Sequence, residues 1–170
     1  RPLRPLFDKS FKKEIQVVPT TISTDQINPP DIVAMVASSA AVVISDIPFD
    51  GPIGAVRVAS LDGELIVNPT FEQIENSELD IVVAGTESAI TMVEGGANEI
   101  PEKTLIAAIE KAREPISELC RIQMQLREIA GKEKQEIIAA EETLDIIEDI
   151  KTFAYPKLEV ACFVKGKHQR

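Results

Sequence analysis

The fold is decided by residues 28–58, which read NPPDIVAMVASSAAVVISDIPFDGPIGAVRV. From Ile32 to Ile44 the residues are apolar or small on every side, and a helix without a polar stripe is expected to be buried on most of its surface. Asp31 precedes this run as a predicted N-cap, because its carboxylate can accept from the free backbone N–H groups of the first turn. The Pro- and Gly-rich turn at 47–52 then ends the helix, and the alternation that follows predicts a strand.

Composition indicates an acidic globular protein of one domain, or of one domain with an appendage. The chain has 170 residues and a formal net charge of −10, which argues against a chain that grips a nucleic-acid backbone by itself, because phosphate contacts need clustered Lys and Arg. Cys120 and Cys162 lack metal-ligand spacing and are expected to be free thiols of a reducing, cytoplasmic compartment. The apolar run at 32–44 is too short to cross a bilayer, so no membrane partner is expected. No signal peptide is visible.

Further strands are predicted on both sides of this helix. Residues 15–23 are rich in β-branched side chains, although Pro19 cannot donate to a ladder and so indicates an edge or a bulge. Residues 53–60 and 64–67 flank Asp-Gly, the pair that tight hairpin turns favour. Residues 79–84 and 89–94 predict a second hairpin, and the polar stretch 68–77 between the two hairpins reads as a turn.

Two helices are predicted in the second half of the chain. The first begins at Pro101, whose missing N–H costs nothing in a first turn, and ends at Gly131; Pro115 is expected to kink or divide it. One face of this helix carries apolar residues at helical spacing: Leu105, Ile109, Ala112, Ile116 and Leu119. A second, amphipathic helix is predicted from Glu133 to about Thr152, followed by a short apolar run at 158–164.

This order of elements predicts an α+β fold, in which helices pack on a mainly antiparallel sheet. The composition changes at residue 132, so we expect two domains: an α+β domain over 1–130 and the start of an all-helical domain over 131–170. The chain begins at Arg1 rather than at Met, and both of its ends are expected to lie within a longer polypeptide.

The arginines at the start of the chain are candidates for anion binding. Arg1 and Arg4 flank prolines, and guanidinium groups match the oxygens of phosphate. A solvated loop is the alternative. The acidic run Glu72, Glu75, Glu78 and Asp80 offers oxygen ligands of the kind that Mg²⁺ prefers, or is the solvated surface of an acidic protein.

Residues that carry nucleophilic or nucleotide chemistry are missing. Ser38 and Ser39 lie within the apolar helix, and the single histidine, His168, is in the C-terminal tail, so a serine triad is excluded. The glycines match neither a phosphate-binding loop nor a dinucleotide-binding fingerprint. The residues themselves therefore indicate an α+β domain with a helical segment and no catalytic constellation.

Several runs, in this order, resemble the polynucleotide phosphorylase family. They are RPLRPLF at 1–7, DIVAM at 31–35, SDIPFDGPIGA at 45–55, NPT at 68–70, LDIVVAGT at 79–86 and MVE at 92–94. The resemblance covers residues 1–115 closely and the helical remainder loosely. It implies the second half of the first of two ribonuclease PH-like domains, followed by the start of the all-helical domain.

The resemblance also implies an activity for the whole enzyme. Members of this family are homotrimers that degrade RNA from its 3′ end with inorganic phosphate, release nucleoside diphosphates and use Mg²⁺. For this segment it implies a catalytically silent scaffold that lines part of the RNA channel of an enzyme of mRNA degradation.

The functional residues of the family carry over in part. In an active domain of the family, a serine-rich loop before the buried helix binds phosphate and two aspartates bind metal. This chain has Asn28-Pro29-Pro30-Asp31 at the loop, and Glu72 and Glu78 at the aspartate positions. Arg1 matches a phosphate-binding arginine of related ribonuclease PH enzymes. We therefore expect no catalytic residue, RNA or phosphate binding at Arg1 and Arg4, and Glu72 and Glu78 as the candidate metal ligands.

Two alternatives stay open at this point. The acidic charge and the missing catalytic groups also fit a stand-alone structural or assembly module without a nucleic-acid role. Glu72 and Glu78 would instead fit an active ribonuclease PH-like metal site.

Overall fold

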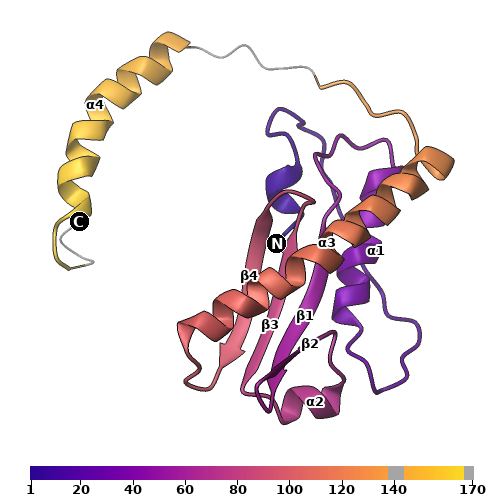
Figure 1. Cartoon of the computed structure of the whole chain (residues 1–170). Coiled ribbons are helices and arrows are strands. Elements are labelled where there is room, and N and C mark those ends of the chain that lie inside the picture. The colour runs from indigo at the N-terminus through magenta and orange to yellow at the C-terminus, as the bar shows by residue number, and fades with distance from the viewer. Residues whose placement is uncertain (138–143, 167–170) are drawn as a thin grey trace. The chain divides into compact units, whose positions relative to one another are not determined.

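The computed structural model of the chain describes residues 1–137 and 144–166. The chain forms two compact units, residues 1–138 and residues 139–170 (Figure 1). In chain order, the first unit contains η1 (Arg4–Leu6), α1 (Asp31–Ile44), β1 (Gly54–Leu61), β2 (Glu64–Val67), α2 (Phe71–Glu75), β3 (Leu79–Gly85), β4 (Ile90–Ala97) and α3 (Glu102–Ala130). The second unit contains α4 (Leu144–Cys162).

The first unit is built on a four-stranded antiparallel sheet with the strand order β2-β1-β3-β4. The predicted Asp-Gly hairpin joins β1 and β2, and Asp62 and Gly63 both have positive φ, 50° and 80°. β3 pairs with β1 from Gly85 opposite Gly54 to Leu79 opposite Ser60. β4 completes the second predicted hairpin at the edge of the sheet, and it extends to Ala97, three residues beyond the predicted end. The α+β class is confirmed.

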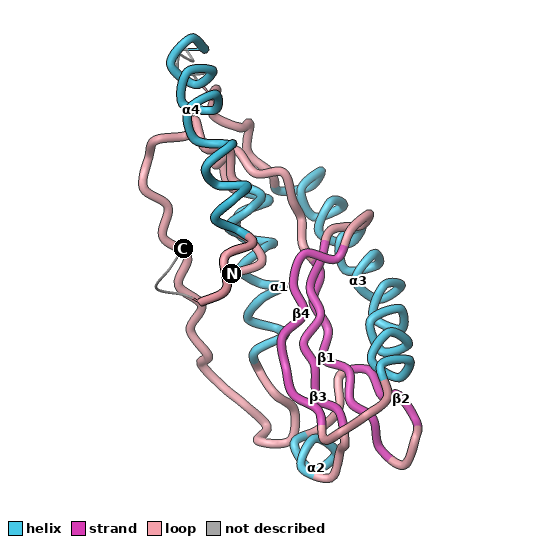
Figure 2. Tube along the Cα trace, turned by 90° about the vertical axis from the view of Figure 1, so that its left-hand side faces the viewer, coloured by secondary structure: helices cyan, strands magenta, loops and turns pink. Residues whose placement is uncertain are grey.

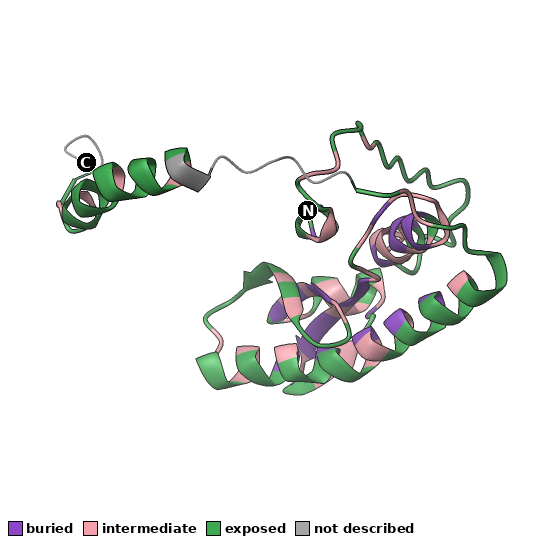
Figure 3. Cartoon of the chain, turned by 90° about the horizontal axis from the view of Figure 1, so that it is seen from above, coloured by how far each residue is buried: buried purple, intermediate pink, exposed green. Residues whose placement is uncertain are grey.

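The core lies between the sheet and α3, which crosses one face of the strands (Figure 1). Val56, Val58 and Val83 are fully buried against Ala112 and Ile116 of the helix. Figure 3 shows buried residues gathered where α3 meets the strands. The apolar face predicted for this helix is therefore the face that packs on the sheet.

Two expectations about helices in this unit differ from the structure. α3 runs through Pro115 without interruption, so it is not divided there, while a kink at Pro115 stays a prediction; the helix ends one residue before Gly131, as predicted. The stretch 68–77 contains the short helix α2 instead of a simple turn. Thr70 and Gln73 form a reciprocal capping box at its start, and each side chain satisfies the other's backbone N–H.

α1 begins and ends as predicted, but the capping of its N-terminus differs from the expectation. Its N-cap is Pro30, which makes no side-chain cap, while the carboxylate of Asp31 binds Arg57 and its own neighbour's N–H. Ser39 and Val43 are buried, whereas Val33 is 69% exposed. The exposed residues of α1 are Val33, Ala37 and Ala41, which form one stripe, and its other residues are buried or half-buried, so the helix is covered on most sides as predicted.

The strand predicted at 15–23 does not form. These residues follow an extended path before α1, and in the described part of the chain none of their backbone groups has a hydrogen-bond partner. Figure 2 shows this part of the chain as a long loop, separate from the strands of the sheet. The composition of the segment is that of a strand, but a strand exists only when a neighbour supplies the ladder.

The helix predicted from Glu133 begins later. Residues 131–137 have no regular secondary structure, residues 138–143 lie outside the described residues, and α4 continues through Pro156. The ammonium of Lys134 instead donates to three carbonyl oxygens at the end of α1, those of Val42 (3.0 Å), Val43 (2.9 Å) and Ser45 (2.7 Å). These contacts satisfy carbonyls that a helix C-terminus leaves free. Among the described helices, none is long and apolar enough to cross a membrane.

Candidate nucleic-acid interface

The N-terminal segment carries a net positive charge, in contrast to the chain as a whole. Residues 1–13 hold five basic residues and one acidic residue, while the rest of the chain has 13 basic and 27 acidic residues. This segment is held in place by η1, and the N–H of Asp50 donates to the carbonyl oxygen of Leu6 at 2.9 Å. The ring of Phe7 packs on Phe49, with centroids 5.0 Å apart. A basic segment is thus fixed on an otherwise acidic unit.

Arg1 and Arg4 line one pocket of about 460 Å³, together with Lys13. The apolar part of its wall is formed by Phe7, Met35 and Ile53. Arg1 is 83% exposed, and its guanidinium lies 3.7 Å from the carboxylate of Glu94. We refer to this site as the arginine pocket. Cationic groups beside an apolar wall can bind both the phosphate of a nucleotide, through charge, and its base, through apolar contact.

The acidic run at 72–80 is divided by the fold. Glu72 lies in the first turn of α2 and Glu78 directly before β3, and both side chains are exposed. Two carboxylates supply hard oxygen ligands, but the described residues contain no group of three or more His, Cys, Asp or Glu placed to hold a metal ion. Asp80, from the same run, points to an arginine instead. The metal site at Glu72 and Glu78 stays a prediction.

Sequence reasoning missed the ion-pair network around Arg57, in the middle of β1. Its guanidinium donates to both carboxylate oxygens of Asp80 on β3, at 2.7 and 2.6 Å, and to Asp31 of α1 at 2.5 Å. The side chain is 17% exposed, and among the described residues its Nε has no partner. Burial alone would lower the pKa of this guanidinium, but the hydrogen bonds and charges of Asp80 and Asp31 outweigh it and raise that pKa.

This network fixes the start of α1 to the sheet. The signal in the sequence was a lone charged residue in each of two apolar strands, Arg57 and Asp80. Their pairing depends on the register between β1 and β3, which places Arg57 opposite Val82 and Asp80 opposite Ala59, diagonally adjacent. Such a register follows from tertiary structure, so the sequence could not specify the partners.

The polar groups of the loop before α1 form hydrogen bonds within the loop. The carboxylate of Asp25 accepts from the backbone N–H groups of Asn28 and Ile27, at 2.9 Å each, and from the Asn28 side chain at 2.6 Å. These hydrogen bonds, led by that from the Asn28 backbone, lower the pKa of the exposed Asp25 carboxyl. Pro29 and Pro30 have no N–H, so they offer no hydrogen-bond donor at the N-terminal end of α1, which is the end of a helix where an anion can bind.

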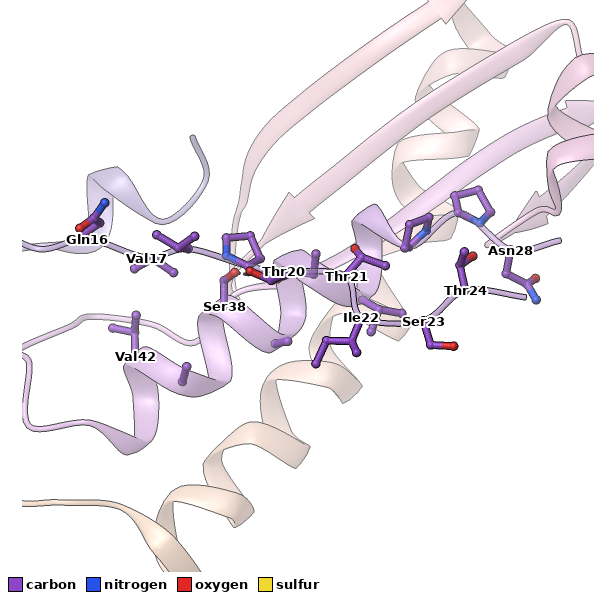
Figure 4. A pocket seen from close by; sticks show the side chains of 18 of the residues that line it. Gln16, Val17, Thr20, Thr21, Ile22, Ser23, Thr24, Asn28, Ser38 and Val42 are labelled. Carbon is purple, nitrogen blue, oxygen red and sulfur yellow. Dashed lines mark hydrogen bonds between the residues drawn. The ribbon is translucent and has the colours of Figure 1, made fainter. Parts of the chain in front are cut away.

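A larger groove of about 990 Å³ runs between α1 and the extended segment that precedes it. Figure 4 shows this segment passing alongside α1, with Ser38 and Val42 of the helix on the other wall. Its lining is made of aliphatic and hydroxyl side chains, with Asp25 as its single charged residue. It therefore lacks the positive charge that a nucleic-acid backbone requires.

Comparison with known proteins agrees with the motifs in the first 115 residues. Residues 51–114, from the turn before β1 into α3, match the 3′ exoribonuclease family, domain 2. A polyribonucleotide nucleotidyltransferase of Treponema denticola is 56% identical over 170 residues, and those of Borrelia turicatae and Borreliella burgdorferi are 57% and 54% identical over 171 residues. Each alignment covers 100% of this chain and 24% of the relative, so the chain spans about a quarter of the length of these relatives.

Proposed function

The chain is homologous to a segment of polyribonucleotide nucleotidyltransferases, and from this premise we propose that it forms part of a phosphorolytic 3′→5′ exoribonuclease. In this proposal the segment is a scaffold that guides RNA and performs no chemistry itself. The observation that carries the RNA-guiding role is the arginine pocket, which gathers three basic side chains on a chain with net charge −10. Because the rest of the chain is acidic and repels phosphate, a phosphate backbone is expected to be attracted to this pocket.

Catalytic silence is supported by the loop before α1. Pro29 and Pro30 remove two backbone donors, Asp25 already accepts the N–H groups of Ile27 and Asn28, and the N–H of Ile32 donates to Asp31. A phosphate ion would meet carboxylates there instead of donors. The hydroxyl of Ser38 donates to the carbonyl oxygen of Ala34 within α1, so its proton is not available to a substrate.

Other parts of the proposal concern the whole enzyme. Inorganic phosphate would attack the 3′-terminal linkage and release nucleoside diphosphates, within mRNA degradation in the cytoplasm. Mg²⁺ would assist that attack by neutralising charge on the phosphate groups. Glu72 and Glu78 would hold a magnesium ion in this segment only through water-completed coordination, since they provide two exposed carboxylates. The assembly we propose is a homotrimer.

RNA binding by the chain tests the role of the arginine pocket. We expect fluorescence anisotropy with labelled oligo(A) to show salt-dependent binding that falls in an Arg1→Ala/Arg4→Ala variant. Two lost phosphate contacts on a single strand should reduce the slope of log affinity against log salt by about 1.4. Arg121→Ala, which removes an exposed arginine of α3 outside the pocket, is the matched control and should change the slope less. Equal effects of both variants would remove the pocket from the proposal.

Catalytic silence is tested by incubating the chain with poly(A), inorganic phosphate and Mg²⁺. We expect no ADP, while a full-length relative run in parallel produces it. ADP formation by this chain that is lost on replacing Glu72 and Glu78 by alanine would establish the active-site alternative and overturn the silent role.

A further inference from the structure

One cation of the arginine pocket is held by a residue from the other end of the first unit's sequence. The ammonium of Lys13 donates to the side-chain oxygen Oε1 of Gln135 at 2.5 Å, across 122 positions of the chain. Gln135 is not among the residues that line the pocket. We propose that Gln135 positions Lys13 for phosphate, so that the pocket binds phosphate more tightly while the segment around Gln135 is docked on α1. This inference rests on the proposed RNA-binding role of the pocket.

Gln135 belongs to a short strap, residues 132–135, that is docked on the C-terminal end of α1. The backbone N–H groups of its first and last residues donate to the carbonyl oxygens of Ile44 (2.9 Å) and Asp46 (2.8 Å). The ammonium of Lys134 donates to three carbonyl oxygens in the last turn and the C-cap of α1. A cation suits this end of a helix, because the free carbonyl groups give it a partial negative charge. The strap is therefore fixed through both its backbone and its side chains.

The side-chain amide of Gln135 has one orientation that satisfies both of its neighbours. Its nitrogen Nε2 donates to the carboxylate of Asp46 at 2.6 Å, and its oxygen Oε1 accepts from Lys13. A carboxylate only accepts hydrogen bonds and an ammonium only donates them, so the reversed amide would offer each neighbour the wrong group. The hydrogen bond from Gln135 lowers the pKa of the Asp46 carboxyl, and the charges of Lys132 and Lys13 add to this effect. The acceptor for Lys13 is thus in place before a ligand binds.

Holding Lys13 in place favours phosphate binding for two reasons. The pocket gathers Arg1, Arg4 and Lys13, whose like charges repel one another, and an acceptor opposes that repulsion. A long lysine side chain also loses rotamer freedom when it is fixed on a ligand, and a side chain that is already held loses less. The ammonium keeps its other N–H donors for phosphate oxygens.

Acylation of lysines tests the positioning without RNA. Limited labelling of the chain with acetic anhydride, followed by mass spectrometry, gives the rate at Lys13 relative to that at Lys12, whose ammonium donates locally to the carbonyl oxygen of Lys9. Gln135→Ala should raise this ratio about two- to tenfold, which is the factor that one net hydrogen bond corresponds to. The reason is that the amine of Lys13 must leave Gln135 before it can react.

The role of strap docking is tested at a residue that does not touch Lys13. Lys134→Met removes the ammonium that binds the end of α1, so it should loosen the strap and raise the labelling ratio as well. Lys132→Met is the matched control, because it removes the same charge from the same strap. In the described part of the chain, the ammonium of Lys132 makes no hydrogen bond or ion pair, so this variant should keep the wild-type ratio.

Binding of labelled oligo(A), measured by fluorescence anisotropy, tests the consequence for the pocket. Gln135→Ala removes no charge, yet the affinity should fall about two- to tenfold at constant salt, by the same lost hydrogen bond. In a Lys13→Met background the same substitution should have no further effect, because Gln135 acts through Lys13. A purely structural effect of Gln135 would weaken binding equally in both backgrounds.

Several results would overturn the inference. One is an equal labelling ratio in the wild type and in Gln135→Ala, and another is an effect of Lys132→Met as large as that of Lys134→Met. In a chain whose oligo(A) binding depends on Arg1 and Arg4, unchanged affinity of Gln135→Ala would overturn it too, as would the same fall in affinity with and without Lys13. If Arg1→Ala/Arg4→Ala binds oligo(A) as Arg121→Ala does, the proposed function fails instead, and the labelling still decides whether Gln135 positions Lys13.

Discussion

A methyl group added at Gly54 tests how closely α3 lies on the sheet. The Cβ of an alanine at this position would be 2.5 Å from the carbonyl oxygen of Ile116 and 2.9 Å from its Cα. Both atoms belong to the backbone of α3, so no side-chain rotation can relieve the contact. The helix and β1 would have to move apart, and the buried pairs between them would loosen.

The size of the effect follows from two opposing terms. Overpacking of a dense core costs about 1–3 kcal/mol, and the lower entropy of an unfolded chain with alanine offsets about 0.4–1 kcal/mol. We therefore expect Gly54→Ala to lower the free energy of unfolding by about 1–2 kcal/mol. Gly96, in the edge strand β4, is the matched control, because a Cβ there meets nothing within 4 Å. Gly96→Ala should be neutral or stabilise slightly.

Urea unfolding followed by circular dichroism measures both variants against the wild type. The urea concentration at the midpoint should fall for Gly54→Ala, while the slope of the free energy of unfolding against urea concentration stays the same. This result would show a loss of stability without a change in the surface exposed on unfolding. Equal losses for the two alanines, or a wild-type midpoint for Gly54→Ala, would refute the close approach of α3 to β1.

Two further predictions concern buried polar groups. Arg57→Met should cost about 1–3 kcal/mol by leaving two carboxylates without their cation, and Asp80→Asn should cost less in that background than in the wild type; additive losses in urea unfolding would contradict the pairing. Burial raises the pKa of the Cys120 thiol above its ordinary value of 9.0. The stability that the buried neutral thiol contributes is therefore complete below pH 9.0, and it is lost as the pH rises through the pKa of the thiol in the folded state. Stability measured against pH should therefore fall more steeply above that value in the wild type than in Cys120→Ala, while Cys162→Ala, at an exposed site, should follow the wild type.

Features that depend on neighbours in sequence could be predicted closely. The hairpin at Asp62-Gly63 follows from two residues that adopt positive φ readily, and the structure has both in that conformation. The buried face of α3 follows from apolar residues at helical spacing, and Gly131 ends the helix as expected. These predictions succeed because turn chemistry and helical periodicity act over a few residues.

Features that depend on distant partners were predicted poorly. The segment at 15–23 has strand composition, but no strand among the described residues lies beside it, so it is extended without ladder hydrogen bonds there. Asp31 was expected to cap α1, but Arg57 from β1 competes successfully for its carboxylate. Residues 133–137 were expected to be helical, yet Lys134 satisfies the carbonyl oxygens at the C-terminal end of α1 instead. In each case a contact across the fold outweighs a weak local preference.

The sequence by itself determined the α+β class, the two hairpins, the helices α1 and α3 and the family resemblance, because these depend on local pattern and on ordered motifs. It also placed Arg1 and Arg4 at the start of a basic stretch. Only the tertiary structure brought Lys13, from twelve residues further along, and Met35 of α1 to the same pocket as Arg1. It alone joined Arg57 to Asp80 and Asp31, because strand register and helix placement are fixed by packing of the whole core.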